Sequence, residues 1–132
     1  MLDTNTISQL IRAQPMVVGR VTATSMASLC MSAITQGELA FGLARRPEAT
    51  RLHLAVRELL RRIDVMPWDS AVAECYGTVQ AAMTQLGKVL APLDMLIAAH
   101  ALSLGAVLVT GDRAFGMVNA LAIEDWSMGQ GA

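Results

Sequence analysis

Residues 92–115, PLDMLIAAHALSLGAVLVTGDRAF, are the stretch that decides the fold. Pro92 opens a segment rich in alanine and leucine and Gly105 closes it, which is typical of a helix with proline in its first turn and glycine just past its end. AVLVT has the composition of a short buried strand, and GDRAF follows it as a turn. A helix, a turn and a buried strand in succession indicate an α/β protein.

The same alternation continues outward along the chain. Helices are predicted over residues 6–12, 17–24, 35–46, 47–63, 69–87 and 92–105. Strands are predicted over residues 1–2, 28–34, 64–67, 106–110 and 121–126. This order predicts a single domain over residues 1–132, with a mostly parallel central sheet of about four or five strands covered by helices on both faces.

Composition supports a folded domain outside the membrane. The chain is 54% hydrophobic, which argues against disorder. No run approaches the roughly 20 apolar residues of a membrane span, and no basic segment followed by an apolar run opens the chain. Cys30 and Cys75 lack metal-ligand or CxxC spacing, which fits a reducing compartment. We therefore expect a soluble, cytoplasmic protein.

Isolated acids recur where a strand or loop leads into a predicted helix or turn. They are Asp3, Glu38, Asp94 and Asp112. In a parallel sheet such junctions collect at the carboxyl edge of the strands, where ligands bind. The four acids are therefore candidates for one functional site.

A purely structural interpretation fits each acid equally well. Asp3 has the position of a helix N-cap, and Thr35 with Glu38 has the spacing of a capping box. Asp94 would interact favourably with a helix dipole, and Asp112 could anchor a turn. Spacing along the chain gives no distances across a sheet, so the residues alone leave both interpretations open.

Four segments resemble the PIN-domain ribonucleases, and specifically the VapC toxins of bacterial toxin–antitoxin pairs. They are LDTN at 2–5, SAITQGELAFGL at 32–43, LAPLDMLIAAHALSLGAVLVTGDRAF at 90–115 and IEDW at 123–126. They occur in the family's order over essentially the whole chain. The resemblance implies a PIN fold and an Mg²⁺-dependent endoribonuclease that cleaves structured RNA and thereby inhibits translation.

The resemblance also assigns roles to individual residues. The catalytic and metal-binding carboxylates would be Asp3, Glu38, Asp94 and Asp112. Asn5 would be the polar neighbour that orients Asp3, and Thr110 would support Asp112 with its hydroxyl.

Two features depart from the family pattern. Family members usually have several more apolar residues before LDTN, so either a short first strand suffices or the start has been placed late. Many relatives also carry an additional acid or Asn directly before the Phe of the last motif, where this chain has Ala114. The fourth acid position therefore depends on Asp112 alone.

The chemistry of the four acids favours a hard cation. Two carboxylates about 5 Å apart repel each other by roughly 3 kcal/mol at an effective dielectric constant of about 20. Oxygen-only ligands select Mg²⁺ first and Mn²⁺ second. Such an ion lowers the pKa of a bound water and stabilises charge on the scissile phosphate.

Basic residues could bind the RNA backbone. Residues 45–62 hold six of the nine arginines, although a solvated helix face is the alternative explanation. The RNA-binding candidates are Arg45, Arg46, Arg51 and Lys88. Aromatic residues make up only 4%, so base stacking should be minor and the shape of a folded RNA loop should determine specificity. Both transfer RNA and ribosomal RNA are family targets, and nothing in the sequence chooses between them.

The resemblance further implies a cognate VapB-type antitoxin as partner and a homodimer formed through helices. One rival interpretation is a catalytically weak or inactive PIN-like module that only binds an antitoxin, which would require a broken set of acids. A haloacid-dehalogenase-like phosphatase is the other rival, but its mechanism needs a second acid two residues after the first, where Asn5 stands.

Overall fold

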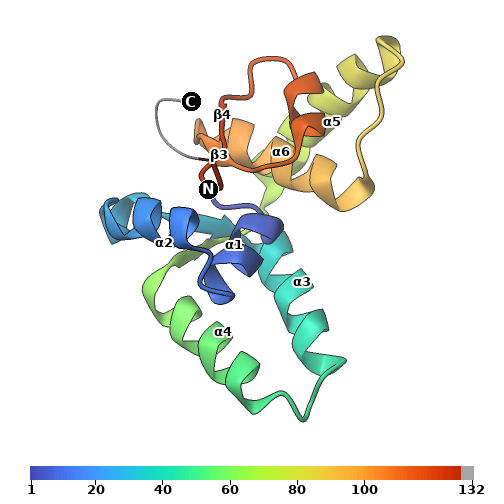
Figure 1. Cartoon of the computed structure of the whole chain (residues 1–132). Helices are drawn as coiled ribbons and strands as arrows, with labels where there is room; N and C mark the ends of the chain where they lie inside the picture. Colours follow the sequence, from blue (N-terminus) through green and yellow to red (C-terminus); the bar gives the residue numbers. More distant parts are fainter. Residues whose placement is uncertain (129–132) are drawn as a thin grey trace.

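The computed structural model describes residues 1–128, in which helices alternate with short strands as predicted (Figure 1). The α-helices are α1 (Thr4–Ile11), α2 (Pro15–Thr22), α3 (Ala33–Ala44), α4 (Thr50–Arg62), α5 (Ser70–Gln85) and α6 (Pro92–Leu104). The strands are β1 (Cys30–Ser32), β2 (Asp64–Met66), β3 (Leu108–Val109) and β4 (Ile123–Glu124). The 3₁₀ helices are η1 (Met26–Ser28) and η2 (Arg113–Met117). None of the helices within residues 1–128 combines the length and apolar character of a bilayer-spanning segment.

The strands form two parallel ladders, β1 with β2 and β3 with β4, and residues 1–3 connect them. On one side, the Leu2 amide donates to the Cys30 carbonyl at 2.9 Å. On the other side, the Asp3 amide donates to the Val109 carbonyl at 3.1 Å, and the Val109 amide donates to the Met1 carbonyl at 2.8 Å. The order across the molecule is therefore β2, β1, residues 1–3, β3 and β4.

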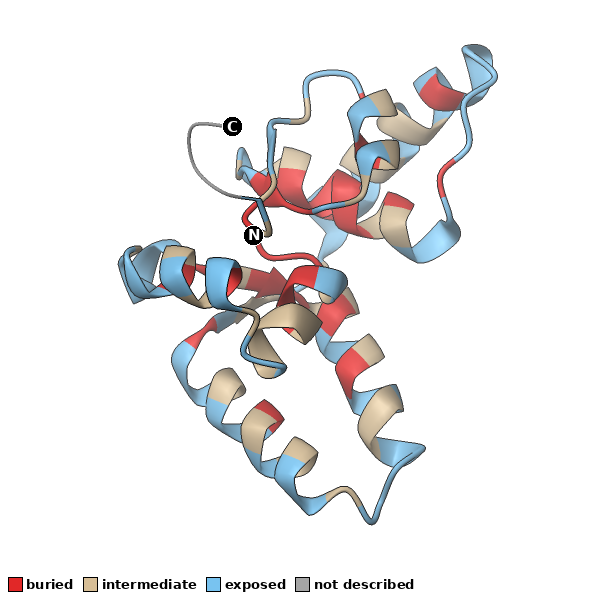
Figure 2. Ribbon diagram, viewed as in Figure 1, coloured by how far each residue is buried: buried red, intermediate tan, exposed pale blue. Residues whose placement is uncertain are grey.

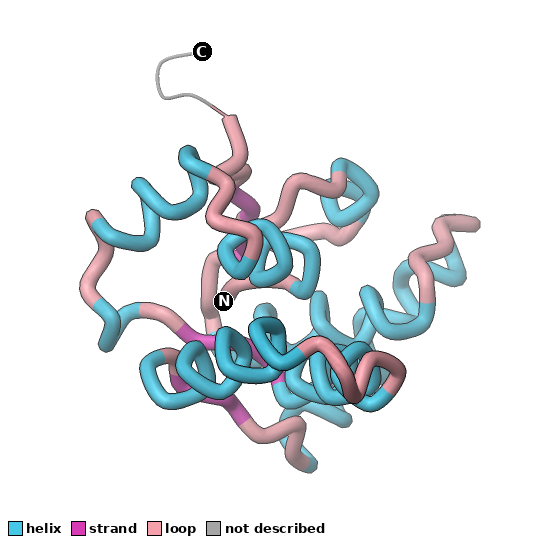
Figure 3. The backbone as a smooth tube through the Cα atoms, turned by 60° about the horizontal axis from the view of Figure 1, so that its bottom comes forward, coloured by secondary structure: helices cyan, strands magenta, loops and turns pink. Residues whose placement is uncertain are grey.

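The parallel α/β architecture is confirmed. The predicted single sheet of about four or five strands is replaced by two sheets of two strands each within residues 1–128. The strands are short (Figure 3), with two or three residues each. Within residues 1–3, only Leu2 pairs with a strand residue, as an isolated bridge to Val109. For residues 1–3 the start of α1 at Thr4 limits the pairing. A short first segment is nevertheless enough to join both ladders.

Side chains from neighbouring positions alternate between two hydrophobic cores. Leu2 and Val109 belong to a core built with α1, α2, α3 and α4. Met1 and Leu108 belong to a second core built with α5, α6 and η2. This alternation follows from the two-residue period of extended chain and confirms that helices cover both faces. Figure 2 shows buried residues along the N-terminal segment, where the two halves of the molecule meet, and along α6 in the half that also contains α5.

Candidate active site

Asp3 lies where the central segment ends and α1 begins. Its side chain is buried, and Oδ1 accepts a hydrogen bond from the Thr6 amide at 2.8 Å, so Asp3 is the N-cap of α1. The Thr6 hydroxyl donates to the Val109 carbonyl at 3.0 Å, which fixes the same turn against β3. Thr6 therefore orients Asp3, whereas Asn5 is exposed and lies beside Asp112 in a surface hollow.

Glu38 lies in α3 and is held by a threonine from α1. The Thr4 hydroxyl donates to Glu38 Oε1 at 2.6 Å and lies 3.2 Å from the Thr35 hydroxyl. The capping-box interpretation is wrong, because Ser32 is the N-cap of α3 and places Thr35 and Glu38 inside the helix. The carboxylate of Glu38 therefore accepts a hydrogen bond from Thr4 on α1 and does not cap its own helix.

Asp112 caps η2 directly after β3. Its Oδ1 accepts from the Ala114 amide at 2.9 Å, and the Asp112 amide donates to the hydroxyl of buried Thr110 at 3.0 Å. Thr110 thus holds the backbone of this turn. The turn interpretation of Asp112 is correct, and it leaves the other carboxylate oxygen available for further contacts.

Asp94 lies in the first turn of α6, which has Pro92 as its first residue and ends at Gly105 in the left-handed conformation, with φ of 63°. Burial raises the pKa of the Asp94 carboxyl, and nearby Asp112, Glu38 and Asp3 raise it further in that order. Like charges raise a carboxyl pKa only when they lie close by. Charges from three other elements, at Asp3, Glu38 and Asp112, therefore act on Asp94 in the folded chain.

A buried histidine connects two of these elements. His100 on α6 and Ser32 at the start of α3 lie side by side, with Nδ1 2.8 Å from the serine Oγ. Burial lowers the pKa of His100, and the lower pKa favours a neutral ring. Asp69 and the Pro67 backbone act in the opposite direction but do not outweigh the burial. This contact ties the helix that carries Asp94 to the helix that carries Glu38. The sequence gives no sign of it, because the two residues are far apart along the chain.

The four acids fit a divalent cation by chemistry and charge. All their donor atoms are carboxylate oxygens, which hard ions prefer, and a cation would relieve the repulsion that raises the pKa of Asp94. Within residues 1–128, no three Asp, Glu, His or Cys side chains form a ready-made ligand group. The hydrogen bonds of Asp3, Glu38 and Asp112 hold one oxygen of each carboxylate at its present partner.

Two of the predicted RNA-binding residues lie beside Glu38. Arg46 and Glu38 line a hollow of about 280 Å³ between α1, α3 and α4, and Arg45 and Glu38 line another of about 620 Å³. The Arg45 guanidinium also lies 5.4 Å from the Phe41 ring centre. Arg51 and Lys88 are exposed and line neither of these hollows.

Comparison with known proteins identifies the family to which this fold belongs. A model of the family described as PIN domain matches residues 1–121. The chain therefore belongs to the PIN-domain family, which excludes the haloacid dehalogenase interpretation.

Similarity to individual proteins narrows the class. The chain is 36% identical to the tRNA(fMet)-specific endonuclease VapC of Shigella flexneri, over 96% of this chain and 97% of that protein. It is 31% identical to ribonuclease VapC2 of Haemophilus influenzae, over 96% of both chains. The crystal structure of DNA-bound VapBC from Salmonella typhimurium superposes with a TM-score of 0.89 and 33% identity, over 96% of both chains. These relatives group the chain with the VapC ribonucleases.

Proposed function

We propose that the chain is a metal-dependent endoribonuclease and acts as the toxin of a VapBC-type pair. The observation that carries the proposal is the convergence on Asp94 of Asp3, Glu38 and Asp112 from other elements. Caps and turn anchors at one edge of a parallel sheet can lie near one another, but gathered carboxylates repel each other, and a bound cation that carries out phosphodiester hydrolysis would offset that repulsion. Asp3 and Asp112 serve both purposes, each using one oxygen as a cap.

Asp3, Glu38, Asp94 and Asp112 would hold the ion, Mg²⁺ in the first place and Mn²⁺ in the second. When bound, such an ion supplies an activated water and stabilises charge on the phosphate. The threonines position the ligands: Thr4 holds Glu38, and Thr110 fixes the Asp112 turn. Asp94, at the N-terminal turn of α6, also places its charge where the helix dipole favours it.

RNA is the substrate in this proposal, with the phosphates bound by Arg45 and Arg46 beside Glu38. The chain has eleven acidic and ten basic residues, so the surface outside the acid cluster is net positive and suits a polyanion. Of the two RNA classes, we propose transfer RNA as the target, because the relative in Shigella flexneri is a tRNA(fMet)-specific endonuclease. Folded RNA also suits a surface with few aromatic side chains.

The proposed partner is a VapB-type antitoxin. Several structural relatives, including those from Salmonella typhimurium and Haemophilus influenzae, are VapBC complexes. The homodimer implied by the resemblance stays a prediction.

Mapping of RNA ends distinguishes an active ribonuclease from an inactive module that only binds an antitoxin. Purified chain is incubated with total cellular RNA, with either Mg²⁺ or EDTA present, and new 5′ ends are sequenced. We expect a small set of new ends in structured RNA with Mg²⁺, their loss with EDTA, and their return when Mg²⁺ is restored. Ends that are the same in every sample, including one without protein, would support the inactive module.

A further inference from the structure

A third hollow, which is polar, is lined by Asp112. It has a volume of about 300 Å³, at the lower limit of the roughly 300–1,000 Å³ of ligand pockets. We call this site the Asp112 hollow. The residues that line it are Asn5, Gln9, Arg12, Gly111, Asp112 and Ser127. They come from α1, from the turn after β3 and from the segment after β4. Every lining side chain is polar and none is aromatic, so a ligand would be bound by hydrogen bonds and charge.

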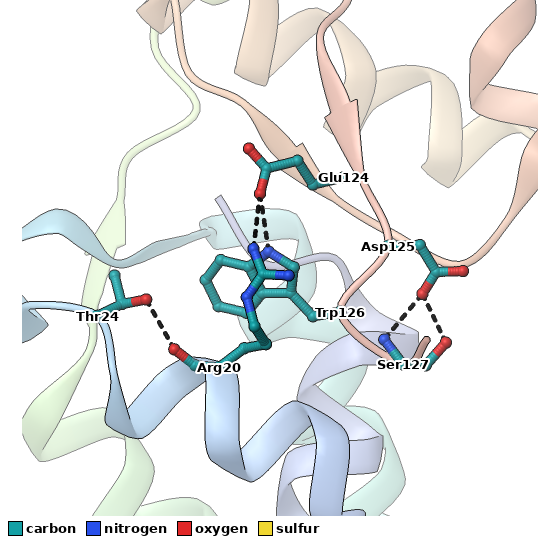
Figure 4. A network of polar contacts seen from close by, with 6 residues as sticks. All are labelled: Arg20, Thr24, Glu124, Asp125, Trp126 and Ser127. Atoms are coloured by element: carbon teal, nitrogen blue, oxygen red, sulfur yellow. Dashed lines mark hydrogen bonds and ion pairs between the residues drawn. The ribbon is translucent and has the colours of Figure 1, made fainter. Parts of the chain in front are cut away.

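The wall formed by the segment after β4 is firmly held (Figure 4). The Trp126 indole donates to Glu124 Oε1 at 3.0 Å, and the Arg20 guanidinium contacts the same oxygen at 3.1 Å. Arg20 also lies over the Trp126 ring, 5.0 Å from its centre. Beyond the tryptophan, the amide and hydroxyl of Ser127 both donate to Asp125 Oδ1. The position of Ser127 is therefore fixed by its neighbours rather than by a ligand.

Arg12 lies between the Asp112 hollow and the hollow of about 280 Å³ that Glu38 and Arg46 line. It lines both, at the C-terminal end of α1, and its side chain is exposed. Within residues 1–128 no carboxylate lies within ion-pair distance of it. An exposed guanidinium that lines two hollows suits a phosphate, to which it offers two parallel hydrogen-bond donors.

The two amides of the hollow suit a nucleobase. Asn5 and Gln9 are on α1, and each amide group both donates and accepts hydrogen bonds, as the edge of a base does. Phosphate alone would need only Arg12. An arginine and two amides in one polar hollow therefore match a whole nucleotide better than a free anion.

We propose that the Asp112 hollow is a nucleotide subsite, which takes the RNA nucleotide next to the scissile phosphate. Arg12 binds a phosphate of that nucleotide, and Gln9 and Asn5 contact the edge of its base. The proposal rests on the proposed ribonuclease function and adds to it a base preference at one position beside the cut. Arg46, which lines the hollow of about 280 Å³ together with Arg12 and Glu38, would then bind the RNA backbone next to this nucleotide.

Binding is measured first, with Asp94→Asn as background so that the RNA stays intact. Adding Arg12→Ala should weaken binding of transfer RNA and reduce the slope of log K against log salt by about 1. Arg61→Ala is the matched control, because the Arg61 side chain is 76% exposed and lies 3.7 Å from Glu58. Equal slopes for the two variants would overturn the role of Arg12.

Cleavage is measured second, in the otherwise unchanged chain, with an RNA library randomised around one cut site. The wild-type chain should prefer one base by about tenfold at one flanking position, and Gln9→Ala should reduce this preference severalfold while cutting continues. Gln85→Ala, exposed at the end of α5, is the control and should keep the preference. An unchanged preference in Gln9→Ala would overturn base contact. If the wild-type chain cuts no RNA, the proposed function fails, and the salt slopes still decide whether Arg12 binds phosphate.

Discussion

Asp94→Asn is expected to lower the rate of RNA cleavage by about a thousandfold or more. Asp94 is the acid on which the charges of Asp3, Glu38 and Asp112 act together, so the proposed cation site depends most on it. The amide keeps the shape of the side chain but removes the charge that would hold a cation. The measurement is the initial rate of appearance of the mapped RNA ends at saturating Mg²⁺.

The loss of activity should occur without loss of the fold. Burial and like charges raise the pKa of Asp94, so above that pKa the ionised form costs the folded chain free energy. A neutral Asn removes this cost, and its melting temperature at neutral pH without metal should equal or exceed that of the wild type. Asp64→Asn, at an exposed position at the start of β2, is the matched control and should cleave at the normal rate. A folded Asp94→Asn chain that cuts RNA as fast as this control would contradict the assignment.

Leu2→Ala is expected to lower the free energy of unfolding by about 2–5 kcal/mol. Leu2 is 0% exposed, and its side chain packs in the core with α1, α2 and α4. It is the middle residue of the segment that connects the two ladders through backbone hydrogen bonds. Alanine keeps the backbone hydrogen bonds and removes only the buried side-chain atoms. Since domains of this kind are stable by about 5–15 kcal/mol, the loss should be plain in urea unfolding curves.

An exposed leucine provides the comparison. Leu54 on α4 is 56% exposed, and Leu54→Ala should change the free energy of unfolding by less than about 0.5 kcal/mol. A loss for Leu2→Ala as small as that for Leu54→Ala would mean that the buried Leu2 side chain contributes little to the stability of the core.

The order of helices and strands could be predicted because its causes are local. Pro92 and Gly105 bound α6, and Asp3 caps α1, each within a few residues of the chain. Strand length could not be predicted, because it depends on pairing between distant segments. The apolar run at 28–34 contributes only Cys30–Ser32 to a ladder.

In the candidate site, too, the features with local causes could be predicted from the sequence, and the contacts between distant segments could not. The resemblance named the four acids, but their convergence on Asp94 depends on how the elements pack. Thr35 and Glu38 have capping-box spacing, yet the Ser32 hydroxyl takes the N-cap and Glu38 binds Thr4 from another helix. The contact of Ser32 with His100 likewise joins distant segments that no local pattern connects.

The central claim is that carboxylates from separate elements hold one divalent-cation site, and Mn²⁺ anomalous scattering tests it most directly. Crystals of the chain are soaked in MnCl₂, and an anomalous difference map is calculated from data collected near the manganese edge. We expect the strongest peak within about 2–2.5 Å of oxygens from Asp94 and at least two of Asp3, Glu38 and Asp112. A manganese peak elsewhere on the chain, with these four carboxylates unliganded at saturating Mn²⁺, would contradict the account.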